Sequence, residues 1–214
     1  MIPKQIFFIW IGDNIPKYVN FSINAFKNLN TDFTIDLIHI ECLETSKNID
    51  VIETKKELEN KNSKLYKIYD SKWKYNNLYT KVGKNIHFSD VFRMYIINKY
   101  GGIYVDCDTF PIRQFDDELL SHKCFSTRNY YYTKKCGPWH DIFFLGTEKG
   151  KYNHRNNYKV DTYTYPHHEL YNIDSLEKFN RSRNNFFNCI NDFNTEYIPK
   201  NKYILHFKAL EWRK

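Results

Sequence analysis

A short apolar strand that ends in two carboxylates constrains this chain more than any other feature. The segment YGGIYVDCDT spans residues 100–109, and its apolar residues 103–105 run directly into Asp106 and Asp108. In an open α/β sheet, ligands bind beyond the carboxyl ends of the strands. Carboxylate oxygens suit Mg²⁺ or Mn²⁺, which also take ligands from substrate phosphates. The segment predicts a site for a divalent cation and a phosphorylated ligand, whereas a lone acidic pair of this kind is often only solvated.

The residues before this strand predict a helix whose polar side chains face the same site. Ser89 suits the N-cap of that helix, and the glycine pair at 101–102 suits its C-terminal stop. Asp90 and Arg93 lie three positions apart, so they share one helical face and can form an ion pair. On a surface such a pair contributes little. Above Asp106, a carboxylate and a guanidinium can instead hold the hydroxyl groups of a sugar.

Three sequence blocks resemble glycosyltransferase family 32, which includes yeast-type initiating mannosyltransferases and bacterial capsule enzymes. The central block, residues 89–108, resembles the DxD region of that family and is similar to the catalytic domain of clostridial glucosylating toxins. Residues 2–12, IPKQIFFIWIG, resemble the family's opening strand, IPKxIHxxWxG. His206 and Trp212 resemble the closing H-x-x-x-x-S-W pattern, in which Glu211 stands where the family usually has serine.

The resemblance implies a GT-A-type fold and a chemistry that the residues alone do not give. It implies a retaining glycosyltransferase that uses Mn²⁺ or Mg²⁺ and a nucleotide-diphosphate sugar, with UDP favoured over GDP, and a glycan or protein acceptor. Asp108 would ligate the cation, Asp106 would bind the ribose or a metal-bound water, and His206 is a candidate third ligand or diphosphate contact. Stabilisation of the departing diphosphate by the cation would be the main catalytic effect.

Other side chains are candidates for substrate binding. Asp90 and Arg93 would hold the donor sugar, and Trp10, at the end of the first predicted strand, would stack on the nucleobase. Without the resemblance, Trp10 would be read as a core residue. The remaining candidates are Tyr104 for the nucleoside, Trp212 as a cover over the diphosphate, and Asp141 on the acceptor side.

Apolar runs predict a single α/β domain over residues 1–214, with a Lys-rich helical insertion near 49–84. Residues 5–11 and 33–40 are typical of buried strands, and residues 16–28 have helical spacing. Alternating strands and helices favour a Rossmann-like, mostly parallel sheet flanked by helices. Further expected elements are strands at 123–127, 142–146 and 203–208, a helix at 175–191 and a long surface loop at 151–168.

A phosphatase is the main alternative. The segment VDCDT also fits the DxDxT motif of haloacid-dehalogenase-type phosphatases, in which the first aspartate, here Asp106, forms a phosphoaspartate. Such enzymes need a later Ser or Thr, a Lys and a late acidic pair. Ser126 can serve as the first, but Asp116 and Asp117 come too early for the acidic pair. The motif also follows a strand-helix-strand segment instead of opening the fold, so the phosphatase ranks second.

The net charge and the cysteine content limit which binding partners and which cellular location are expected for this protein. A net charge of +7 permits nucleic acid, but the chain has no RNA-binding aromatic signature or finger spacing, so nucleic acid is a weak alternative. The same charge suits a nucleotide diphosphate, an anionic glycan or peripheral contact with an anionic membrane. The five cysteines include no CxxC pair, which fits reduced thiols. Without a signal peptide pattern or a transmembrane run, a cytoplasmic location is expected.

Overall fold

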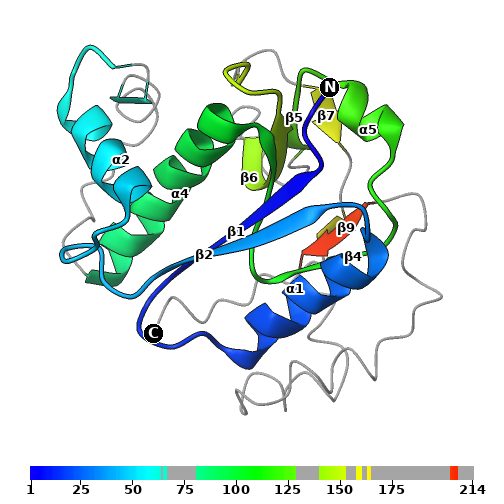
Figure 1. The fold of residues 1–214 in the computed structure, drawn as a ribbon, viewed down its shortest axis with the longest axis horizontal. Helices are drawn as coiled ribbons and strands as arrows, with labels where there is room; N and C mark the ends of the chain where they lie inside the picture. The colour runs from blue at the N-terminus through cyan, green and yellow to red at the C-terminus, as the bar shows by residue number, and fades with distance from the viewer. Residues whose placement is uncertain are drawn as a thin grey trace, which may run out of the picture.

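A six-stranded mixed sheet with helices on both faces forms the centre of the structure (Figure 1). The computed structural model describes residues 1–63, 65–66, 81–128, 140–152, 158–160, 163–164 and 203–206. The strand order is β2-β1-β3-β6-β5-β7. The strands are β1 (Gln5–Ile11), β2 (Thr34–Ile40), β3 (Gly102–Val105), β5 (Cys124–Arg128), β6 (His140–Thr147) and β7 (Tyr158–Val160).

Five of these six strands run in one direction. Strand β6 is antiparallel to its neighbours β3 and β5, and the other pairings, β1 with β2, β1 with β3 and β5 with β7, are parallel. The α/β class with a mostly parallel sheet, predicted from the alternating apolar runs, is confirmed. The strands predicted at 5–11, 33–40, 123–127 and 142–146 form within a residue or two of the expected bounds.

The alternating side chains of β1 divide the core between the two faces of the sheet. Ile6 and Phe8 belong to a buried cluster with helix α1 (Lys17–Leu29). Phe7 and Ile9 belong to a second buried cluster with helix α4 (Lys81–Tyr100). Figure 1 shows the two helices on opposite sides of the sheet. A strand covered on both faces needs apolar residues at nearly every position, which explains the continuous apolar run in the sequence of β1.

The helix that precedes β3 begins earlier than predicted. It starts at Lys81, so Ser89 lies in its middle and the predicted N-cap is wrong. The Ser89 hydroxyl instead accepts a hydrogen bond from Arg93 Nη2 at 3.3 Å, and its carbonyl oxygen accepts one from Arg93 Nε at 3.2 Å. Residues 81–88 contain no proline that would stop a helix. The capping preference of Ser89 alone therefore does not make the helix begin at that residue. The predicted stop is confirmed, since Gly101 follows the last helical residue with φ +76°.

The segment predicted as helical over 49–84 is not one helix. Helix α2 (Ile49–Glu59) begins at the Asn48 cap and is followed by a turn through Ser63. In that turn Asn60 Oδ1 accepts a hydrogen bond from the Asn62 amide at 3.0 Å, a local bond that competes with helix continuation. Helix α2 is joined to α4 by Lys99, whose Nζ lies 2.8 Å from Asp50 and 2.7 Å from Glu53.

A second, three-stranded sheet adjoins the point where β3 ends. Its order is β4-β9-β8, with β4 (Thr109–Pro111), β8 (Tyr163–Thr164) and β9 (Ile204–His206). Strands β4 and β9 are antiparallel, and Thr109 pairs with His206. The predicted strand at 203–208 therefore forms over Ile204–His206 and lies outside the main sheet. The loop predicted at 151–168 contains β7 and β8, since main-chain pairing with β5 and β9 orders it in two places.

Helix α5 (Asp117–Ser121) follows β4 and is capped by Asp116, whose Oδ1 accepts a hydrogen bond from the Leu119 amide at 2.9 Å. The helix predicted at 175–191 lies outside the described residues. Among the helices that the structure describes, none combines the length and apolar character needed to span a bilayer.

Replacing Gly102 by alanine is expected to weaken the contact between β3 and β1. Gly102 has φ +105°, and a Cβ there would lie 2.8 Å from the Gln5 carbonyl oxygen. Gly150 is a matched control, because it has φ +71° but nothing within 4 Å of an added Cβ. We expect Gly102→Ala to lower the free energy of unfolding by about 3 kcal/mol and Gly150→Ala by about 1 kcal/mol, measured by chemical denaturation. Equal losses in the two variants would contradict this account.

Candidate active site

The turn after β3 presents two aspartates at the carboxyl end of the sheet. The Asp106 amide donates a hydrogen bond to the Phe143 carbonyl oxygen of β6 at 2.8 Å. The Thr109 hydroxyl donates to the Asp106 carbonyl oxygen at 2.7 Å, and the Thr109 carbonyl oxygen accepts from the Ser22 hydroxyl of α1 at 2.7 Å. The main chain of β6, a side chain of α1 and a hydrogen bond within the turn therefore fix the segment that carries Asp106 and Asp108.

Arg93 joins the first aspartate of the turn to the helix above it. Its Nη1 lies 2.8 Å from Asp106 Oδ1, and its Nη2 lies 2.9 Å from Asp90 Oδ1. The predicted pair of Asp90 and Arg93 is therefore present, and it extends to the turn. The Arg93 side chain is only 8% exposed, so this is a buried arrangement rather than a pair of solvated surface charges.

Tyr104 contacts both Arg93 and Asp106. The Arg93 guanidinium carbon lies 4.5 Å from the centre of the Tyr104 ring, and the Tyr104 hydroxyl donates a hydrogen bond to Asp106 Oδ1 at 2.6 Å. Tyr104 is 2% exposed. We call Asp90, Arg93, Tyr104 and Asp106 the arginine cluster. Arg93 and Tyr104 both contact the same carboxylate oxygen, so they hold the Asp106 side chain in one orientation.

Burial sets the protonation of groups around the turn. Burial raises the pKa of the Asp106 carboxyl, while the Arg93 guanidinium opposes that rise. Burial also raises the pKa of the Tyr104 hydroxyl well above its usual value, which keeps it a hydrogen-bond donor. The same effect raises the pKa of the Cys107 thiol, which donates to the Ile9 carbonyl oxygen at 3.3 Å. Cys107, between the two aspartates, is therefore a neutral core residue and no nucleophile.

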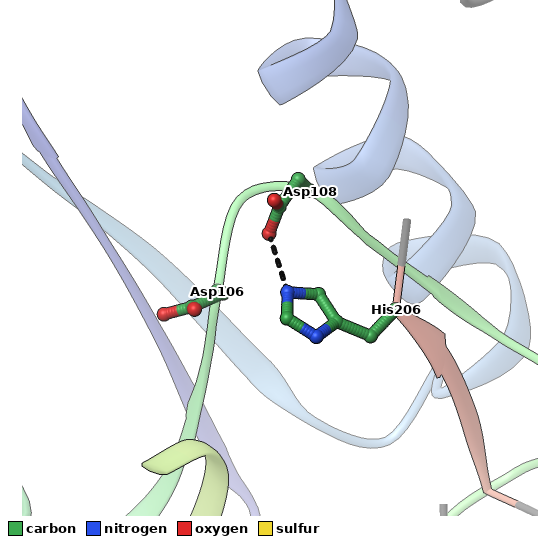
Figure 2. A group of neighbouring side chains, drawn as sticks. All are labelled: Asp106, Asp108 and His206. Atoms are coloured by element: carbon green, nitrogen blue, oxygen red, sulfur yellow. Dashed lines mark ion pairs between the residues drawn. The ribbon is translucent and has the colours of Figure 1, made fainter. Parts of the chain in front are cut away.

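The second aspartate faces a histidine from the other sheet. Asp108 Oδ1 lies 3.3 Å from His206 Nε2, and the His206 ring stacks on Phe143 at a centroid distance of 4.0 Å. Figure 2 shows the Asp108 carboxylate pointing at the imidazole, whereas the Asp106 carboxylate points away from it. Asp106, Asp108 and His206 each offer a ligand atom, and these atoms lie within 4.8 Å of one another. Two carboxylates and an imidazole are a donor set that fits a divalent cation such as Mn²⁺.

The other predicted site residues are placed less completely. Trp10 is the penultimate residue of β1 and lies opposite His39 of β2. Its indole nitrogen donates to the Asn14 carbonyl oxygen at 2.8 Å, and its ring meets the Tyr18 ring edge to face at a centroid distance of 6.1 Å. The backbone of Asp141 pairs with Thr127 in the main sheet, but its side chain lies outside the described residues. Trp212 lies outside them as well.

Three contributors to the site were not predicted from the sequence. Phe143 supports the His206 ring, Ser22 holds the turn through Thr109, and Ser89 supports Arg93. Phe143 falls within a predicted strand and Ser22 within a predicted helix, but no local pattern identifies their partners. Ser89 carried a clear local signal, which pointed to a helix cap instead of a side-chain contact.

Comparison with known families identifies the chain. Residues 16–126 match the family described as a glycosyltransferase sugar-binding region containing a DXD motif. The matched range covers just over half of the 214 residues and includes α4, β3 and both aspartates of the turn. This chain therefore belongs to that DXD-containing glycosyltransferase family. Family membership favours the glycosyltransferase interpretation over the phosphatase.

Several solved structures of glycosyltransferases are similar to the chain. The PaToxG glycosyltransferase is 20% identical, with 70% of this chain and 56% of that chain covered and a TM-score of 0.42. The catalytic domain of alpha-toxin from Clostridium novyi is 15% identical, with coverage of 70% and 55% and a TM-score of 0.39. The galactosyltransferase LgtC, in complex with donor and acceptor sugar analogs, is 9% identical, with coverage of 96% and 87% and a TM-score of 0.46. The chain spans about half the length of the first two of these proteins. Among curated proteins, no sequence matches significantly.

Loss of the Arg93 guanidinium is expected to destabilise the protein strongly. Arg93→Met leaves the carboxylates of Asp90 and Asp106 without the guanidinium that lies between them. In a buried setting, removing one partner of an ion pair lowers the free energy of unfolding by about 3 kcal/mol. Lys4→Met is the matched control, because it breaks the exposed pair of Lys4 and Asp32, which lie 2.5 Å apart. That change should cost far less, because solvent screens an exposed ion pair. Urea denaturation at neutral pH measures both, and a loss in Arg93→Met no larger than the control would refute the role assigned to the cluster.

Proposed function

We propose that this chain is a retaining glycosyltransferase that depends on Mn²⁺ or Mg²⁺. Its donor is a nucleotide-diphosphate sugar, with UDP favoured, and its acceptor is a glycan or protein. The observation that carries the proposal is the meeting of Asp108 with His206 beside the arginine cluster, at the carboxyl end of β3. Membership in the DXD-containing family supports the same conclusion.

Asp108 and His206, with Asp106 beside them, are the residues that would hold the cation. A bound divalent cation supplies positive charge that stabilises the departing diphosphate. Imidazole is a less common ligand for Mg²⁺ than for transition metals, so His206 favours Mn²⁺ over Mg²⁺. The ring of His206 is held by its stacking on Phe143, which limits the directions in which its Nε2 can point.

The arginine cluster would orient the donor. We assign ribose binding to Asp106, whose carboxylate is fixed by Arg93 and Tyr104. Asp90 would accept hydrogen bonds from hydroxyl groups of the donor sugar, while Arg93 holds Asp90 and Asp106 at a set separation. Fixed contacts of this kind place the anomeric carbon for attack and lower the entropic part of the barrier. Tyr104 is buried behind Asp106, so we propose that it acts through that carboxylate and not by direct contact with the nucleoside.

Three substrate contacts extend the proposal. Trp10 lies near the carboxyl end of β1, where it would stack on the nucleobase. Trp212 would cover the diphosphate, and Asp141 would lie on the acceptor side.

Peripheral contact with an anionic membrane remains a prediction from the net charge of +7.

Asp108→Ala should abolish cation-dependent turnover. We expect UDP release from UDP-sugars to fall on the order of 10²-fold or more, because charge stabilisation of the leaving group is lost. Asp117→Ala is the control, because Asp117 is an exposed carboxylate in α5 and should leave both turnover and its dependence on Mn²⁺ unchanged. Full activity in Asp108→Ala, or in wild-type protein with excess chelator, would contradict the proposal.

Asp90→Asn should separate nucleotide binding from sugar positioning. We expect the affinity for free UDP to stay within about twofold while turnover falls on the order of 10²-fold, because misplacement of the reacting carbon slows transfer. Asp50→Asn is the control on the neighbouring helix α2, since Asp50 braces α4 through Lys99 and Tyr100 at a distance from the turn. It should lower the melting temperature slightly and leave kinetics normal. Calorimetric UDP titration and a UDP-release assay on both variants decide the point, and normal turnover in Asp90→Asn would exclude the sugar-binding role.

A further inference from the structure

His206 reaches Asp108 only because a very short strand is held in one register. Strand β9 has three described residues, and it pairs with β4, which also has three. Pro111 of β4, opposite Ile204, has no amide hydrogen to donate. Side chains alternate between the two faces of a sheet, so a slip of one residue would turn His206 away from Asp108. On its other side, β9 pairs with the two residues of β8, Tyr163 opposite Leu205 and Thr164 opposite His206. The described main-chain pairs that set the register of β9 are therefore few.

A side-chain anchor lies immediately before β9. The Tyr203 hydroxyl donates a hydrogen bond to Asp116 Oδ1 at 2.8 Å, and the Arg113 guanidinium carbon lies 3.8 Å from the centre of the Tyr203 ring. Arg113 Nη2 lies 3.1 Å from Asp116 Oδ2, which closes a triangle. We call Arg113, Asp116 and Tyr203 the tyrosine clamp. Its three members hold one another through a hydrogen bond, an ion pair and a cation–π contact.

The clamp joins β9 to a well-anchored part of the fold. Asp116 also caps α5 through the Leu119 amide at 2.9 Å, so its carboxylate is fixed. The Ile112 amide, just after β4, donates to the Tyr203 carbonyl oxygen at 2.8 Å. The Tyr203 ring is 8% exposed and meets Phe115 edge to face at 6.0 Å. Tyr203 is therefore held at its hydroxyl, its ring and its carbonyl oxygen, and its position sets which residue of β9 lies opposite Thr109.

We propose that the tyrosine clamp is a positioning device that fixes the register of β9 and thereby sets the affinity of the Asp108–His206 site for a divalent cation. Tyr203 is a positioning residue, since it touches neither Asp108 nor His206 among its described contacts. The inference rests on the proposed cation site. It adds that part of the cation affinity is determined by a hydroxyl group outside that site, three residues before His206.

Tyr203→Phe tests the clamp with a minimal change, because it removes only the hydroxyl that reaches Asp116. We expect the dissociation constant for Mn²⁺, measured from the EPR signal of the free ion with and without saturating UDP, to rise on the order of tenfold. Tyr95→Phe is the matched control, because its hydroxyl also donates to a carboxylate, that of Glu53, but on the α2 side of α4. Tyr95→Phe should cost comparable thermal stability and leave Mn²⁺ affinity unchanged.

A double-mutant cycle separates positioning of His206 from general loosening. If the clamp acts through His206, Tyr203→Phe should have no further effect on Mn²⁺ affinity in a His206→Ala background. Wild-type affinity in Tyr203→Phe, or an equal loss with and without His206, would overturn the inference while leaving the cation site standing. Failure of the cation site itself has a different signature: the wild-type protein would bind no Mn²⁺, or Asp108→Ala would bind it normally.

Discussion

The Arg93 guanidinium is the group on which the site depends. It lies within 3 Å of carboxylate oxygens from a helix and from a strand end, and it stacks on the tyrosine that precedes the turn. Two partly buried carboxylates repel one another and lose hydration, and a cation held between them offsets both costs. The same contact joins α4 to the end of β3. A change at Arg93 would therefore affect both the packing of α4 on β3 and the orientation of the Asp106 carboxylate.

The elements around this contact could be predicted because their signals are local. The apolar run that ends at Asp106 identifies β3, and the spacing of Asp90 and Arg93 places them on one helical face. The continuous apolar run at Gln5–Ile11 predicts a strand covered on both sides, and the two core clusters confirm it. Each of these inferences needs only the period of a helix or a strand and a few neighbouring residues.

What could not be predicted depends on contacts between segments distant in sequence. Ser89 does not act as a cap, because α4 already begins at Lys81, and its hydroxyl accepts a hydrogen bond from Arg93 instead. Tyr104 has the same strand pattern whether it faces a ligand or lies behind Asp106, and only the position of α4 decides between them. The last strand was expected from its apolar residues. Its place in the second sheet, opposite Thr109, follows from tertiary pairing that no local pattern encodes.

The two halves of the site differ in how firmly the fold holds them. Asp90, Arg93 and Asp106 lie on the main sheet and its covering helix, where buried side chains fix them directly. Asp108 and His206 meet across a junction between sheets, and one side of that junction is a three-residue strand. Charged and polar groups stabilise a developing charge best when the fold already holds them in place before the substrate binds. A short strand cannot meet that requirement through main-chain bonds alone, so the contacts of Tyr203 with Asp116 and Arg113 supply what the second sheet lacks.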